Sequence, residues 1–138
     1  MAYFDLASGA KTAQAGAAAV YTDHLTGLTV DTRGCDTLYC IVNMGTATSS
    51  ASLTLKMQDG AASNLSDAAD ITSATFTAMT ASAHEGIQVG RLNLTGVNRY
   101  VRVYGTYAGS GNIPVSVAFV MGVSDSNDAT TPDFNLIP

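Results

Sequence analysis

Apolar and polar residues alternate over most of the chain from Asp36 onward, which is the period of a β-strand with one buried face. The clearest run is Ser52–Gln58, where Leu53, Leu55 and Met57 face one way and the residues between them face the other. Similar runs cover 38–44, 71–79, 87–94, 100–107 and 113–121, with weaker ones at 18–21 and 28–30. Because no segment carries the longer apolar period of a helix, the sequence predicts an all-β fold.

Turn residues divide these runs into about eight short strands, a spacing that favours an antiparallel β-sandwich, jelly-roll-like or immunoglobulin-like. Asp59-Gly60 and Gly109–Asn112 are expected to form turns, the second one a hairpin, and at most one helical turn is expected near 65–69. Pro114 lacks a backbone donor and is expected at a strand start or on an edge. The predicted core consists of Leu38, Cys40, Val42, Leu53, Leu55, Met57, Val101, Val103, Val115, Val117 and Phe119.

The two ends of the chain differ from the middle. The 138 residues fit one domain, which we place at 17–122, between an N-terminal arm at 1–16 and a C-terminal arm at 123–138. Both arms lack a strand period but carry large apolar side chains, namely Tyr3, Phe4 and Leu6 in the first and Phe134, Leu136 and Ile137 in the second. Because such anchors gain buried area only on docking, we expect the arms to order against neighbouring subunits, and frayed chain ends are the alternative.

The charge of the chain is low and acidic. Six Lys and Arg stand against eleven Asp and Glu, for a net charge of -5, which argues against a nucleic-acid partner. Charged residues make up only 12% of the chain, and a weakly charged exterior suggests extensive protein contact. The N-terminus shows no signal-peptide pattern, and no run of about 18 apolar residues occurs. We therefore expect a soluble, cytosolic chain with no membrane partner.

Metal and cofactor sites are not predicted. Cys35 and Cys40 would lie roughly 16 Å apart in an extended strand, too far for a disulfide, and they lack a partner pair at zinc spacing. Both are expected as small apolar residues in or near the core. The segment from Asp125 to Asp133 is rich in oxygen ligands but lacks the glycine and closing glutamate of a calcium loop.

Catalytic motifs are not apparent either, and we expect no catalytic residues and no enzyme activity. The G-x-S-x-G pentad of hydrolases does not occur, and His24 and His84 have no recognisable catalytic partners. Arg91, Arg99 and Arg102 concentrate positive charge in an acidic chain. They suit carboxylate pairing across an interface, and equally a solvated strand face.

Four stretches together resemble a known family: Val30-Asp-Thr-Arg-Gly-Cys-Asp-Thr-Leu, Leu53-Thr-Leu-Lys-Met-Gln-Asp-Gly, Gly96-Val-Asn-Arg-Tyr-Val-Arg-Val-Tyr and Val117-Ala-Phe-Val-Met-Gly. Over 28–122 the chain resembles the head decoration, or cement, proteins of tailed bacteriophages. Asn98-Arg-Tyr-Val-Arg-Val, with the earlier Asp-Gly, is the most specific part of this resemblance.

The resemblance implies a β-sandwich that docks on the outside of an icosahedral shell and joins neighbouring major capsid subunits, often as a homotrimer. It implies a virion protein of the capsid exterior, made in the host cytoplasm, with the major capsid protein as its partner. The candidate residues for binding the capsid or a neighbouring subunit are Tyr3, Phe4, Leu6, Arg99, Arg102, Phe134, Leu136 and Ile137.

Three other functions stay open at this point. The chain could be a phage tail or baseplate subunit. It could be a carbohydrate-binding β-sandwich that stacks sugars on Tyr100 and Tyr104, or a hydrolase whose polar residues converge only in three dimensions.

Overall fold

The structure of the chain is a computed structural model that describes residues 10–82, 86–122 and 134–137. These residues form eleven β-strands and no helix, so this part of the chain holds no helix that could cross a membrane. All strand pairs are antiparallel, and the strands form two sheets. The all-β antiparallel sandwich predicted from the alternation is confirmed.

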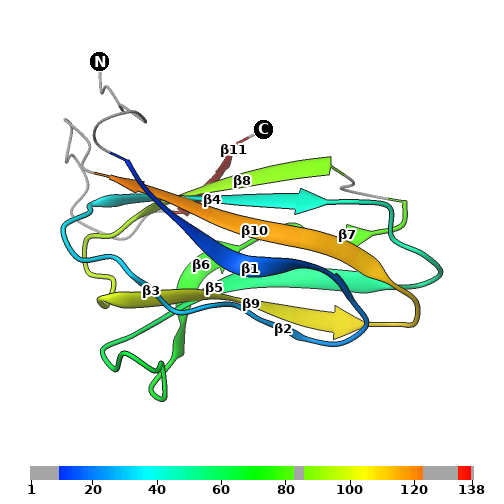
Figure 1. Ribbon diagram of the computed structural model, residues 1–138, viewed down its shortest axis with the longest axis horizontal. Helices are drawn as coiled ribbons and strands as arrows, with labels where there is room; N and C mark the ends of the chain where they lie inside the picture. The colour runs from blue at the N-terminus through cyan, green and yellow to red at the C-terminus, as the bar shows by residue number, and fades with distance from the viewer. Residues whose placement is uncertain (1–9, 83–85, 123–133, 138) are drawn as a thin grey trace.

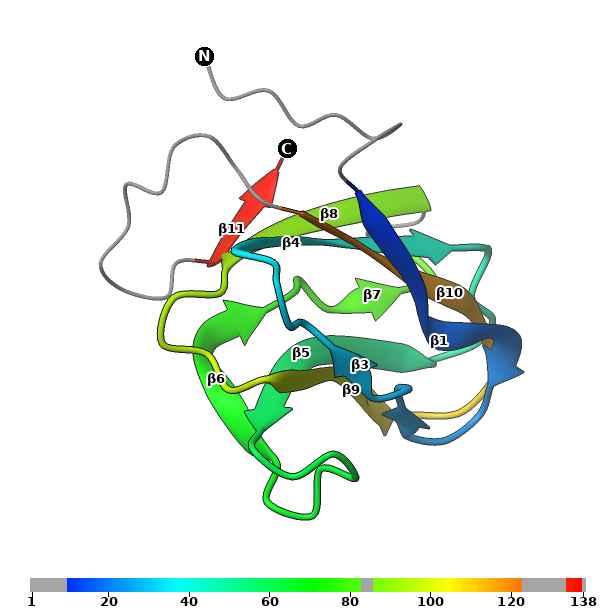
Figure 2. The ribbon, with the colours of Figure 1, turned by 60° about the vertical axis from the view of Figure 1, so that its left-hand side comes forward.

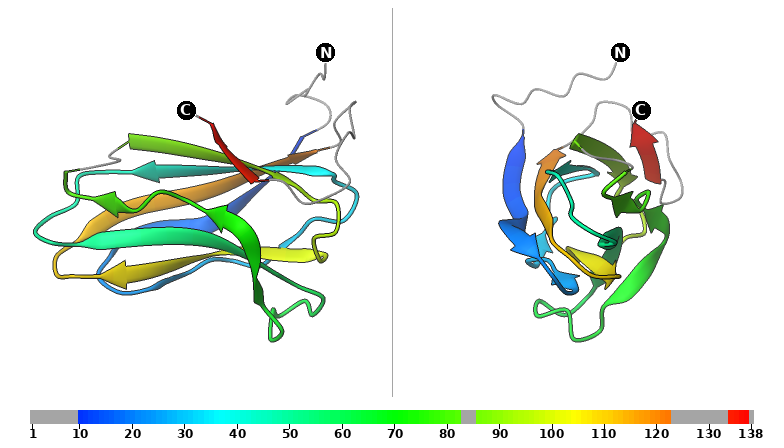
Figure 3. Two further views of the ribbon diagram at one scale, coloured as in Figure 1. Left: turned by 180° about the vertical axis from the view of Figure 1, so that it is seen from behind. Right: turned by 90° about the vertical axis from the view of Figure 1, so that its right-hand side faces the viewer.

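The two sheets face each other across the core (Figure 1, Figure 2). Sheet A has five strands in the order β1 (Lys11–Tyr21), β10 (Ile113–Gly122), β4 (Thr37–Met44), β8 (Gly86–Asn93) and β11 (Phe134–Ile137). Sheet B has six strands: β2 (Leu25–Thr26), β9 (Tyr100–Ala108), β5 (Ser52–Gly60) and β6 (Ala69–Thr75) in that order, with β3 (Val30–Asp31) also on β9 and β7 (Met79–Thr80) also on β5. The end-on view in Figure 3 shows the sheets enclosing the core.

The core forms where the inward-facing residues of the two sheets meet. All eleven residues predicted for it are buried, and none is more than 4% exposed. They are joined by residues outside the predicted set, among them Leu25, Met79, Leu92 and Ile113. Cys40 is fully buried, which raises the pKa of its thiol, and Cys35 is half-buried against the same core. Both cysteines therefore pack as the sequence predicts.

The loop after β5 differs from the turn that the sequence predicts. The predicted Asp59-Gly60 turn is wrong, because β5 continues through Gly60 and the loop covers 61–68 instead. The Asp67 carboxylate accepts the backbone N–H groups of Ala61 (2.8 Å) and Ala62 (3.2 Å) and so closes this loop. At most one helical turn is expected near 65–69, and none forms there: Leu65 has a φ of 53°, which interrupts any helical path.

The Gly109–Asn112 segment corrects a second expectation. It was predicted as a hairpin turn, but it connects β9 in sheet B to β10 in sheet A and so crosses between the sheets. Gly109 and Gly111 both have positive φ angles, 85° and 116°. The alternation of two successive strands cannot tell whether they pair with each other or lie in opposite sheets, since both have one buried face.

The ends of the described chain take part in sheet A. β1 begins at Lys11, so Lys11 to Gly16 belong to a strand although the sequence places them in the N-terminal arm. β11 lies within the predicted C-terminal arm and pairs with β8. Pro114 is the second residue of β10, near a strand start as expected.

Candidate interaction surfaces

The outer face of sheet A is apolar. Three rows of outward-facing residues cross its central strands: Val120, Tyr39 and Arg91; Ala118, Ile41 and Val89; Ser116, Asn43 and Ile87. Ile87 is 68% exposed, and Ile41, Val89 and Val120 are half-buried. No described residue outside the sheet forms a further layer over them (Figure 1). The face therefore presents branched aliphatic side chains to its surroundings.

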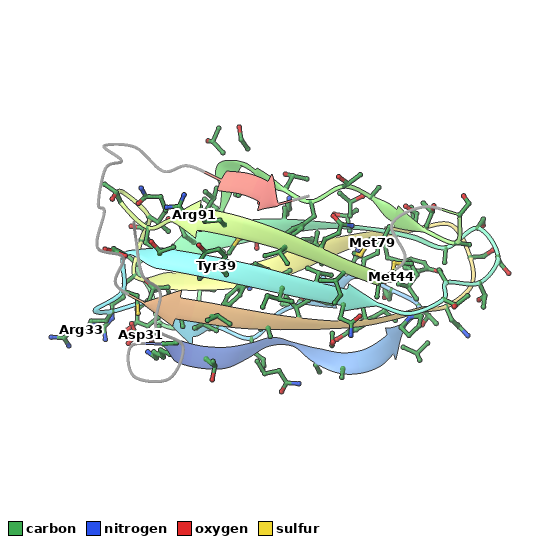
Figure 4. All side chains as sticks on the ribbon, turned by 90° about the horizontal axis from the view of Figure 1, so that it is seen from above. Asp31, Arg33, Tyr39, Met44, Met79 and Arg91 are labelled. Carbon is green, nitrogen blue, oxygen red and sulfur yellow. The ribbon has the colours of Figure 1, made fainter. Side chains whose placement is uncertain are left out.

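Charge is almost absent from this face. Arg91 is the only charged residue in β10, β4 and β8 together. It lies beside Tyr39 on the neighbouring strand, near one end of the sheet, whereas Met44 lies at the other end (Figure 4). An apolar surface with so little charge is typical of a protein contact rather than of a solvated face.

Two shallow depressions open on the outer face along β1 and β10. The first, of about 400 Å³, forms over the register shift at Gly16 and is lined by small and polar residues such as Thr12, Ser116 and Ala118. The second, of about 410 Å³, lies next to Pro114, Gly45 and Ala18. We call them the Gly16 hollow and the Pro114 hollow; Ser116 lines both.

The outer face of sheet B is polar, and its side chains bind one another. Arg102 donates from Nε to Oε1 of Gln58 at 2.9 Å, and Gln58 donates from Nε2 to Asp70 at 2.7 Å. Lys56 forms an ion pair with the same carboxylate at 2.6 Å. Lys56 and then Gln58 hold the pKa of the Asp70 carboxyl below its usual range. We call these four residues the polar ladder.

The tyrosines considered for sugar stacking lie on this polar face, at alternate outward positions of β9. Each already has a cation over its ring: Nζ of Lys56 lies 5.5 Å from the ring centroid of Tyr104, and the Arg99 guanidinium carbon lies 5.1 Å from that of Tyr100. His24 stacks on Tyr104 with ring centroids 6.1 Å apart, and its Nδ1 accepts the backbone N–H of Tyr107 at 3.0 Å.

The three arginines singled out in the sequence do not come together. Arg91 lies on sheet A, whereas Arg99 and Arg102 lie at sheet B. Arg99 forms a two-bond ion pair with Asp31, Nε to Oδ1 at 2.9 Å and Nη2 to Oδ2 at 2.7 Å. Both Arg99 and Arg102 thus bind groups of this same chain.

The remaining predicted binding residues belong to the two arms. Tyr3, Phe4 and Leu6 lie outside the described residues, as do His84 and the oxygen-rich segment before Phe134. Phe134, Leu136 and Ile137 are in β11, where the backbone pairs with β8.

Sequence reasoning missed the apolar outer face, although a signal for it exists. In β4 the residues Cys40, Ile41 and Val42 are all apolar, and β10 likewise carries apolar residues at outward positions, including Val120. A strand that is apolar at both inward and outward positions is one with both faces covered.

Within the part of the chain that the structure describes, no group of three or more His, Cys, Asp or Glu side chains could hold a metal ion. In that same part, every buried side-chain nitrogen or oxygen has a hydrogen-bond partner.

Comparison with known proteins assigns no role to these surfaces. A scan of the sequence against protein-family models gives no match, and a search of curated proteins gives none.

Proposed function

We propose that the chain is a virion structural protein that decorates the outside of a bacteriophage head and stabilises contacts between major capsid subunits, with the outer face of sheet A directed at its protein partner. The observation that carries the proposal is the contrast between the two outer faces. Sheet A presents Ile41, Val89 and Val120 with a single arginine beside them, whereas the polar groups of sheet B bind each other.

The physical chemistry supports this orientation. Burying apolar area stabilises association by about 25 cal/mol per Å², so aliphatic side chains gain free energy when a partner covers them. The polar ladder gains little from burial, because its groups already have partners and would lose water. The acidic, weakly charged chain also suits a protein contact better than a nucleic-acid contact.

Rebinding to heads that lack the protein tests the proposal. Purified chain should bind such heads at a copy number comparable to that of the capsid protein. Ile41→Lys places a charge on the outer face of sheet A and should abolish retention; Thr54→Lys, at a half-buried outward position of β5 in sheet B, is the matched control and should retain binding.

The same measurement separates the alternatives within the virion. A copy number far below that of the capsid protein, with the chain in purified tails, would place it in the tail or baseplate. Failure of the folded wild-type chain to bind heads at all would rule out the decoration role.

A carbohydrate-binding role has one observation in its favour, since Tyr100 and Tyr104 lie on the same face as Arg102 and Gln58. A sugar stacked on Tyr104 would have to displace Lys56 or His24 from the ring. A glycan array with a Tyr104→Ala control tests this role: a signal that disappears in the variant would establish it.

A further inference from the structure

Sheet A carries positive charge although the chain as a whole is acidic. None of the five strands of sheet A contains Asp or Glu, whereas the chain has eleven such residues in total. The cationic residues of these strands are Lys11 and Arg91. Nζ of Lys11 donates to the backbone carbonyl of Asp31 in sheet B at 2.9 Å. Arg91 is therefore the cation that the outer face of sheet A offers to another protein.

The Arg91 guanidinium has no partner in the described part of its own chain. The ion pairs there join Lys56 to Asp70 and Arg99 to Asp31. No described group hydrogen-bonds the Arg91 side chain. The N–H donors of this guanidinium are therefore available to a group from outside the chain.

The residues around Arg91 on the outer face are aromatic or aliphatic. Tyr39 lies opposite Arg91 on β4 (Figure 4), and Val89 is the next outward residue along β8. Ile41 is the outward residue of β4 opposite Val89. Arg91 is itself half-buried among these neighbours. A protein that covers Ile41 and Val89 must therefore also remove water from Arg91.

Removing water from an unpaired cation opposes docking. Burying a charge without a partner costs more free energy than the burial of one aliphatic side chain gains. A carboxylate offsets this cost, because the planar guanidinium donates two parallel hydrogen bonds to its two oxygens and the charges cancel. A backbone or amide oxygen accepts a hydrogen bond but leaves the charge uncompensated. Since the strands of sheet A carry no acidic residue, the face itself does not repel a carboxylate.

We propose that Arg91 determines the specificity of the sheet A face, and that the shell protein presents one Asp or Glu carboxylate to it within an otherwise apolar surface. The inference rests on the proposed function, which directs this face at the shell, and it adds the chemistry of the surface that fits. Because aliphatic side chains enclose the pair, salt screens it less than an exposed ion pair.

Retention on heads that lack the protein tests the inference with matched substitutions. Arg91→Gln removes the charge, and its control is Arg102→Gln, the same change at a half-buried arginine on the outer face of sheet B. Arg91→Gln should weaken binding about 30-fold or more, because it leaves the carboxylate of the shell buried and unpaired, whereas Arg102→Gln should bind like the wild type. Arg91→Lys keeps the charge but not the two parallel bonds and should fall between them.

The stability of the isolated chain separates docking from a structural role of Arg91. Because no described group bonds its side chain, Arg91→Gln should leave the urea midpoint of the isolated chain unchanged. A variant with the wild-type midpoint that also binds heads as tightly as the wild type would overturn the inference. Weaker binding that is matched by a loss of stability would assign Arg91 a structural role and overturn it too.

A zero-length carbodiimide crosslinker identifies the partner group directly. It joins a lysine amine to a carboxylate in contact with it, so Arg91→Lys on decorated heads should become linked at position 91 to an Asp or Glu of the shell protein. Mass spectrometry of the digested product locates the link, and the wild type, which has no amine at this position, is the control. A link from position 91 to a second copy of this chain, or no link on heads that retain the variant, would overturn the inference.

These outcomes differ from those that decide the proposed function. Heads that bind the wild type and Arg91→Gln equally well would overturn the carboxylate contact and leave the decoration role standing. A folded wild type that binds no heads would overturn the decoration role itself, and the Arg91 contact with it.

Discussion

At the scale of single residues, Asp31 shows how the hydrogen bonds of an exposed carboxylate hold segments at the end of sheet B together. Its carboxylate accepts two hydrogen bonds from Arg99 and one from the backbone N–H of Arg33 at 3.0 Å. Arg99 first, and then the N–H of Arg33, hold the pKa of the Asp31 carboxyl well below its usual range. Such a carboxyl contributes stability above its unfolded pKa of about 4, and the contribution is lost as pH falls through the lower folded pKa.

Asp31→Asn should therefore lower the urea midpoint at neutral pH, because the ion pair with Arg99 is gone. The difference in urea midpoint between variant and wild type should narrow as the pH falls below about 4. Below that pH the unfolded chain takes up the proton first, and the ionised Asp31 carboxylate stabilises the folded state less and less. Urea unfolding at a series of pH values measures this. Curves that stay parallel down to the most acidic pH would show that Asp31 contributes no charge-dependent stability.

Leu55 represents the other kind of residue, one whose role follows from burial alone. It is fully buried in the middle of β5, so Leu55→Ala should lower the free energy of unfolding by about 2–5 kcal/mol through lost burial and a residual cavity. Thr54→Ala, at the adjacent outward position, should change it by about 0.5 kcal/mol or less. Equal effects in denaturant unfolding would mean that the register of β5 is wrong.

At the scale of elements, the segment after β2 joins the two sheets. Gly27 donates its backbone N–H to Val103 in sheet B at 2.7 Å, and Leu28 donates to Ala15 in sheet A at 2.8 Å. A Cβ on Gly27 would lie 2.5 Å from the carbonyl oxygen of Val103 and 2.6 Å from that of Ala15. Only a residue without a side chain fits between these backbones.

Gly27→Ala should accordingly destabilise the fold by about 1–3 kcal/mol, because the backbone must shift to admit the methyl group. Thr29→Ala, at an exposed position nearby, serves as the control and should be close to neutral. Thermal or urea unfolding compares the two. A neutral Gly27→Ala would mean that the sheets are not joined this closely.

The strands themselves follow from the sequence where one face is buried. Alternation predicted the core of β4, β5, β9 and β10, and every predicted core residue is buried. It did not predict that 71–79 divides into β6 and β7, where Ser73 has a φ of 65° and Phe76 turns into the core. Nor could it predict which strand pairs with which, because pairing depends on contacts between distant segments.

The candidate surface was harder to predict than the core. The arginines were singled out because charge is scarce in this chain, yet Arg99 and Arg102 bind groups of their own subunit. Ile41 and Val89 form part of the apolar surface because β4 and β8 are neighbours and no further layer of described residues lies over them. Which strands are neighbours depends on the order of strands in the sheet, which the alternation of one strand does not contain.

At the scale of the whole molecule, the chain has one apolar and one polar outer face. Docking through one face should depend on salt concentration differently from docking through the other. Docking through the apolar face of sheet A should survive a wash in about 1 M salt, because screening acts on charge pairs and not on apolar burial. Docking through Arg99 and Arg102 should be lost under the same wash. Gel analysis of washed heads measures the retained protein, and its release at high salt would contradict the apolar contact.

The most direct measurement of the central claim is an electron cryomicroscopy map of heads decorated with the purified chain. The account predicts sandwich-shaped density on the outside of the shell, with β4, β8 and β10 of sheet A directed at neighbouring proteins and the polar ladder of sheet B directed at solvent. Density in which sheet B faces the shell, or heads that carry no such density after incubation with folded protein, would contradict it.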